Sequence, residues 1–153
     1  MVITEEKHVL NEFKITQIKI LKDRIGEKVW RENGIEMNTG QLMILYYLWQ
    51  KNHETISEIS RQTSLANNTV SIMINGMVKK GLVKRKTNPK DRRQTIVSLT
   101  EYGESLRGIY AKMAQQMDNL FYHDFTLEER LAFEEKLDRI IQHLKQFEDT
   151  RHE

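Results

Sequence analysis

The stretch Leu82–Thr100, which reads LVKRKTNPKDRRQTIVSLT, decides how this chain is interpreted. Two short runs of β-forming residues flank a turn that contains Pro89, the single proline among the 153 residues. This pattern predicts an antiparallel hairpin. Nearly every charge near the turn is positive, so the hairpin would carry a cationic tip suited to a polyanion.

The charges of the chain are segregated by sign. The whole sequence holds 24 Lys and Arg and 22 Asp and Glu, and outside residues 79–93 acidic residues outnumber basic ones. A mildly acidic body with one concentrated basic region indicates a nucleic-acid face, whereas a merely solvated charged loop would not require this segregation. Residues 79–93 hold one acid, Asp91, and the basic residues Lys79, Lys80, Lys84, Arg85, Lys86, Lys90, Arg92 and Arg93.

Two short helices are expected immediately before the hairpin. Thr55, with Glu58 three residues later, predicts a capping box that begins the first helix. After a polar turn, Asn67 is expected to cap a second helix that runs from about Asn68 to Lys80 and stops at Gly81. Its inner stripe is Val70, Met73, Ile74 and Met77.

Two helices, a tight turn and a following hairpin form a winged helix-turn-helix, which we place at residues 38–99. Asn38 and Gln41 predict a capping box for its leading helix, whose expected core face is Leu42, Leu45, Leu48 and Trp49. Together these patterns predict a mainly α fold with a small β-hairpin wing.

Apolar helical stripes flank this module on both sides. An N-terminal helix is expected from Thr4 to the Asn33-Gly34 break, and Thr100 and Thr126 are expected to cap two C-terminal helices. Their apolar residues recur at spacings of three and four, which is typical of a helix–helix seam. This seam is too extensive for a small monomer, so residues 1–37 and 100–153 are expected to form dimerisation helices.

The composition limits the possible functions. The sequence contains no cysteine, which excludes disulfides, thiolate metal sites and thiol-based redox sensing within these residues. No apolar run approaches the length of a membrane span and the N-terminus does not resemble a signal peptide, so a cytoplasmic protein is expected. We find no glycine-rich phosphate loop and no nucleophile motif, so neither an enzyme nor a cofactor is expected.

Four segments carry a resemblance to a known family: Thr69–Ser71, Lys79–Arg85, Pro89–Arg93 and Val97–Gly103. They resemble the MarR family of bacterial transcriptional regulators. The wing signature of that family is Asp, any residue, Arg, three residues, Val, any residue and Leu-Thr. It is matched here at Asp91, Arg93, Val97, Leu99 and Thr100.

The resemblance implies a homodimeric winged-helix repressor whose N- and C-terminal helices interlock. Each recognition helix would enter a major groove of a pseudo-palindromic operator in double-stranded DNA, and each wing would reach a minor groove. Many family members lose DNA affinity when a small aromatic or amphipathic effector binds between the two lobes.

The outward face of the second helix is the expected base-reading surface. Asn pairs with adenine, whereas Ser and Thr adapt to several partners. Ile72 departs from the basic or polar residue common in the family, and we expect it to contact a thymine methyl group unless the assigned face is off by one residue. Gly76 is a second departure, because a glycine inside a helix costs about 1 kcal/mol relative to alanine. The expected contacts are Asn67, Asn68, Thr69, Ser71, Ile72 and Asn75, and the alternative is an ordinary solvated face.

At the wing, Arg93 matches the position where the family places a minor-groove arginine, and Asp91 is expected to orient its guanidinium. The alternative is that this pair only braces the hairpin. Arg92 lies beside it at the tip. Phosphate contacts are expected from Lys84, Arg85, Lys86 and Lys90.

An effector pocket is harder to place. Trp30, Met43, Tyr46 and Tyr47 lie where the resemblance implies a ligand site, although aromatic residues at helical spacing are more often core.

No metal is expected, because the histidines form no pair at three- or four-residue spacing. A metal-responsive regulator using His123 and Asp124 across the dimer stays an alternative.

Three further alternatives remain open from the sequence. The fold could serve an effector-independent DNA-binding protein, an activator, or a dimer that binds only proteins. Charge segregation argues against the last of these.

Overall fold

The computed structural model describes residues 5–151, with side chains from Glu12 onward. Its elements confirm the mainly helical fold with a small sheet. In chain order they are α1 (Glu5–Glu32), α2 (Thr39–Gln50), β1 (Glu54–Thr55), α3 (Ile56–Thr63), α4 (Asn67–Lys79), β2 (Val83–Thr87), β3 (Thr95–Leu99), α5 (Glu101–Phe121) and α6 (Leu127–Thr150). The expected start of the first helix at Thr4 lies outside the described residues.

One hydrophobic core joins the helices to the sheet. The inner face of α2 supplies Ile44, Leu45 and Leu48, all at most 1% exposed. The predicted inner stripe of α4 is confirmed, since Val70, Ile74 and Met77 are fully buried and Met73 packs against them. The remaining core residues come from the end of α1 and the loop that follows it, and from α2, α3, the hairpin and α5: Trp30, Ile35, Met37, Trp49, Ile59, Leu82, Val83, Val97, Leu99 and Leu106.

Three of the five caps predicted within the described residues form as expected. The capping boxes at Asn38 and Thr126 are complete, and the Thr100 hydroxyl accepts from the Gly103 amide at 3.0 Å. At Thr55 the hydroxyl accepts from the Glu58 amide. The Glu58 carboxylate, however, binds Arg61 and Gln62 instead of completing the predicted box, because both donors lie within one turn on the same helix.

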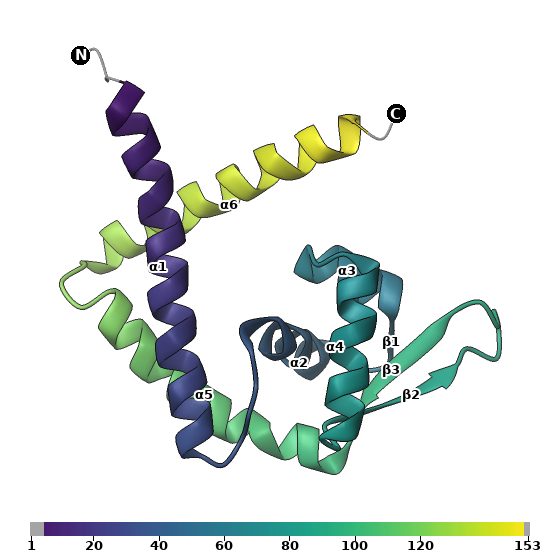
Figure 1. The fold of residues 1–153 in the computed structure, drawn as a ribbon. Helices are drawn as coiled ribbons and strands as arrows, with labels where there is room; N and C mark the ends of the chain where they lie inside the picture. Colours follow the sequence, from purple (N-terminus) through teal and green to yellow (C-terminus); the bar gives the residue numbers. More distant parts are fainter. Residues whose placement is uncertain (1–4, 152–153) are drawn as a thin grey trace. The chain divides into compact units, whose positions relative to one another are not determined.

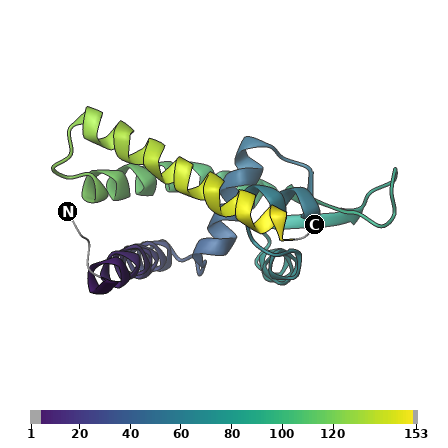
Figure 2. The same cartoon turned by 90° about the horizontal axis from the view of Figure 1, so that it is seen from above.

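The sheet has three antiparallel strands in the order β1-β3-β2. Val83 pairs with Leu99 and Thr87 with Thr95, which sets the register of the hairpin. The short strand β1 was not expected from the sequence, since two residues carry no alternation that could reveal it. The hairpin β2–β3 extends beyond helices α2, α3 and α4 in two views at right angles (Figures 1 and 2).

The chain separates into two compact units, one ending at Met113 and the other beginning at Ala114. The first half of α5 therefore belongs with the winged-helix core, against which Leu106, Ile109 and Tyr110 pack. In the second unit Arg130 lies 4.5 Å from the Tyr122 ring centroid and binds Asp118 on α5 and Glu134 on α6. These contacts join the two helices of that unit.

Candidate nucleic-acid interface

Helix α4 turns a mixed polar and apolar stripe to solvent. Asn68, Ile72, Asn75 and Lys79 recur at spacings of four, three and four, directly opposite the buried stripe, and all four are exposed. The Ile72 side chain is 72% exposed, which confirms the assigned face. Of the other expected contacts, Asn67 is exposed, whereas Thr69 and Ser71 are half-buried.

The expected N-cap of α4 is wrong by one residue. Asn67 is the first helical residue, and Ala66 takes the cap position with extended backbone and no side-chain hydrogen bond. The amides of the first turn therefore lack a side-chain acceptor from the cap, which leaves an electropositive helix end. Such an end suits a phosphate oxygen.

Glycine is unfavourable inside a helix, but Gly76 stands where α2 approaches α4 closely. A Cβ atom on Gly76 would lie 3.2 Å from Nε2 of the buried Gln41. Gln41 is held in turn by Lys80, whose Nζ donates to its Oε1 at 3.2 Å and also to the Glu36 carbonyl. Lys80 therefore ties the end of α4 to the α1–α2 connection.

Arg93 at the wing is held by Asp91. Its Nε donates to Oδ1 at 3.2 Å, its Nη2 donates to Oδ2 at 3.4 Å, and its backbone amide donates to Oδ1 at 3.1 Å. The Arg93 side chain is nevertheless 91% exposed. The carboxylate thus fixes the guanidinium in a defined direction without covering it.

The loop that carries these residues is internally bonded. Asn88 and Gln94 are joined by a backbone hydrogen bond and by a side-chain bond of 2.9 Å, and the Lys90 amide donates to the Asn88 Oδ1. The cationic side chains of the wing are presented to solvent on this braced loop. Lys84, Arg85, Lys86, Lys90, Arg92 and Arg93 are all exposed.

One contact in this region was missed by sequence reasoning. The Arg85 guanidinium donates to Oδ1 of Asn75, which links the wing to the recognition helix. Alternation along β2 could have indicated it, because Arg85 shares a strand face with the buried Val83, whereas Lys84 lies on the other face.

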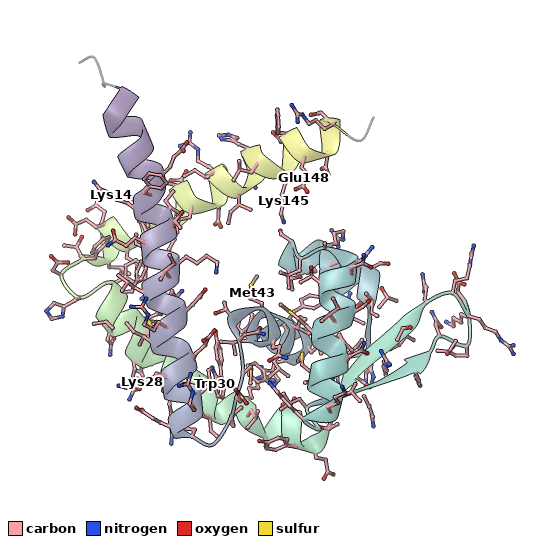
Figure 3. All side chains as sticks on the ribbon, viewed as in Figure 1. Lys14, Lys28, Trp30, Met43, Lys145 and Glu148 are labelled. Atoms are coloured by element: carbon pink, nitrogen blue, oxygen red, sulfur yellow. The ribbon has the colours of Figure 1, made fainter. Side chains whose placement is uncertain are left out.

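The four expected pocket residues differ in their burial. Trp30 is 1% exposed and lies in the core, at the lower end of α1 in Figure 3. On α2, Met43 and Tyr46 are more than 40% exposed, whereas Tyr47 is half-buried and packs against the core. Desolvation and the nearby Glu54 and Glu58 raise the pKa of Tyr47, which keeps its hydroxyl protonated.

Trp30 has one unusual property. Its Nε1–H is buried without a hydrogen-bond partner among the described residues, whereas the corresponding group of Trp49 donates to the Gly103 carbonyl at 3.0 Å. An unsatisfied buried donor costs about 1–3 kcal/mol.

The described part of the chain shows neither a metal-ligand cluster nor a membrane-spanning helix. No group of three or more His, Asp or Glu side chains with metal-binding geometry occurs in it. No helix of the described residues is long and apolar enough to cross a membrane.

Comparison with known proteins agrees with this geometry. The family model described as "MarR family" matches residues 37–95. The HTH-type transcriptional regulator YsmB of Bacillus subtilis (strain 168) is 31% identical over 114 residues, which are 74% of this chain and 77% of that protein. The chain belongs to the MarR family.

Solved structures extend the similarity to nearly the whole chain. The structure of reduced AbfR bound to DNA superposes with a TM-score of 0.74 at 26% identity, covering 92% of this chain and 97% of AbfR. A MarR mutant from E. coli complexed with operator DNA gives a TM-score of 0.79 and shares the fold at 21% identity, covering 91% and 99% of the two chains.

As a MarR-family member the protein is a DNA-binding transcriptional regulator and not an enzyme. Its wing signature combines two kinds of residue. Val97 and Leu99 are buried and Thr100 caps α5, so these positions build the fold. Asp91 and Arg93 instead form the presented tip of the wing.

Proposed function

We propose that this MarR-family protein is a cytoplasmic repressor that binds a pseudo-palindromic operator as a homodimer. In each protomer α4 enters a major groove, and the wing places Arg93 in the adjacent minor groove. Asn67, Asn68, Thr69, Ser71, Ile72 and Asn75 contact bases or their phosphates in this arrangement, and Lys84, Arg85, Lys86, Lys90 and Arg92 bind the backbone. A side chain that is 91% exposed yet bound by a carboxylate supports this role for Arg93 most directly.

The homodimer is supported by unpartnered apolar side chains. On α1, Ile18, Leu21 and Ile25 recur at spacings of three and four and are 44%, 47% and 39% exposed. On α6, Leu144 and Phe147 are 64% and 60% exposed. Helices that expose so many large apolar residues at seam spacing are stabilised by burying them against another chain. Residues 1–37 and 100–153 supply the dimerisation helices in this proposal.

Release by a small effector is supported by Trp30. Its buried, unpartnered Nε1–H offers a hydrogen bond to a ligand that carries an acceptor, such as a phenolic acid. Tyr47 packs against the same core as Trp30, and in this proposal it contacts the ligand together with the more exposed Met43 and Tyr46.

The proposal is tested by a footprint of the full chain on the DNA upstream of its own gene, repeated with phenolic acids and with divalent metal ions. We expect symmetric protection that one acid abolishes, and Trp30→Phe should keep the protection but lose the response. Absence of any protected site in a scan of candidate promoters would contradict the repressor function. Protection that no compound alters would favour the effector-independent alternative, and loss with a metal ion would favour the metal-responsive one.

A further inference from the structure

The outward stripe of α4 places one apolar side chain among amides. Ile72 lies between Asn68 and Asn75 and is 72% exposed. A single exposed isoleucine is ordinary on a protein surface. Its position matters here because it lies one helical turn from Asn75, on the face that would meet the base edges.

Arg85 determines which atom of Asn75 is available to DNA. A guanidinium group only donates hydrogen bonds, so the Asn75 atom that it contacts must be the acceptor Oδ1. The remaining group, Nδ2–H₂, is a donor. The contact engages Oδ1 and fixes the amide plane, so Asn75 is not free to rotate into the bidentate pose that recognition of adenine requires.

The apolar side chain of Ile72 and the Nδ2–H₂ donor of Asn75 together complement the major-groove edge of one base. In the major groove adenine offers an acceptor beside a donor, guanine two acceptors and cytosine a donor, whereas thymine offers the O4 acceptor beside a C5 methyl group. We propose that Ile72 and Asn75 together recognise one thymine in each operator half-site. Ile72 packs on the methyl group, and Asn75 donates from Nδ2 to O4.

This inference rests on the proposed operator binding, so its test begins by finding a DNA sequence that the protein binds. Duplexes enriched from a random pool by the full-length protein supply that sequence. Each thymine is then replaced by uracil, which removes the methyl group and leaves O4 unchanged. At one position in each half-site we expect Kd to rise about fourfold, the effect of losing one buried methyl group.

Variants assign that effect to Ile72. Ile72→Ala should bind the thymine and uracil duplexes equally, because the side chain that reads the methyl group is gone. Val78→Ala, a matched change at a 37% exposed residue of α4 outside the stripe, should keep the fourfold preference. Both variants should show the wild-type circular dichroism spectrum.

A second pair of variants tests the role of Arg85. Arg85→Ala and Lys84→Ala each remove one positive charge from β2, but only Arg85 binds Asn75. Arg85→Ala frees the amide to rotate, so adenine should become acceptable at the recognised position. Lys84→Ala should weaken binding to all sequences without changing the base preference.

Two results would overturn the inference in distinguishable ways. An enriched site at which uracil replaces every thymine without loss of affinity would exclude methyl recognition while leaving operator binding intact. Failure to enrich any sequence over random DNA would contradict the proposed function itself, and the thymine assignment with it.

Discussion

At the residue scale, the wing depends on a single carboxylate–guanidinium pair. Asp91 binds Arg93 through two side-chain bonds and one backbone bond, so the arginine is organised before DNA arrives. An exposed ion pair of this kind contributes little to folding stability. Its value lies in the direction that it gives to an otherwise mobile side chain.

We expect Arg93→Ala to raise the operator Kd about tenfold or more, equivalent to about 1.4 kcal/mol, while the fold is unchanged. Arg92→Ala is the matched control, since it removes the same charge from the same tip without touching the Asp91 pair. It should weaken specific and random DNA alike. A fluorescence anisotropy titration measures both, and equal effects of the two variants would show that Arg93 acts only as a charge.

Glu58, in α3, makes a pH-dependent contribution to the folding stability. Hydrogen bonds from Arg61 and Gln62 lower the pKa of Glu58 from 4.5 to about 2. Because the pKa is lowered on folding, this stabilisation is present above about pH 4.5 and is lost as the pH falls toward 2. The Tm of wild type should therefore slightly exceed that of Glu58→Gln at pH 6, and the difference should vanish near pH 2. A constant difference across this range would exclude the carboxylate as its source.

At the element scale, close approach of the hairpin to α5 depends on Gly103. A Cβ atom at this position would lie 2.1 Å from the Leu82 carbonyl oxygen, and the Gly103 carbonyl accepts from Trp49 at 3.0 Å. Backbone atoms block the added methyl group, so the helix must shift to accept it.

Gly103→Ala should destabilise the protein by about 1–3 kcal/mol, the usual cost of overpacking. Gly108→Ala, on the same helix with nothing within 4 Å of its Cβ position, should stabilise it by about 1 kcal/mol through helix propensity. Urea denaturation measures both changes. Equal effects of the two substitutions would show that α5 does not need close contact at Gly103.

Local signals in the sequence were sufficient for most elements. The caps at Asn38, Thr100 and Thr126 and the buried stripe of α4 follow from short-range chemistry that a sequence displays directly. The Arg85–Asn75 bond and the unpartnered Trp30 donor depend on packing between distant segments. Alternation along β2 indicates the strand face of Arg85 but not its partner on α4, and no local pattern marks the Trp30 donor, so both features required the structure.

At the scale of the whole molecule, the proposed homodimer accounts for the apolar residues left exposed on α1 and α6. The full chain of 18.2 kDa should sediment at twice that mass at micromolar concentration. Leu144→Lys should shift it toward the monomer, because it places a charge in the seam. Gln142→Lys adds the same charge on the opposite face of α6 and should leave the dimer intact. A wild-type monomer at these concentrations would contradict the proposed assembly.

The central claim is that α4 and the wing recognise a specific DNA sequence. It is tested most directly by titrating the full chain against its enriched duplex and against a shuffled duplex of equal length, at several salt concentrations. We expect the enriched duplex to bind about 10³-fold or more tightly at physiological salt, with affinity for both falling as salt rises. Equal affinities for the two duplexes at every salt concentration would contradict the account, because the basic wing would then act only as a general polyanion-binding surface.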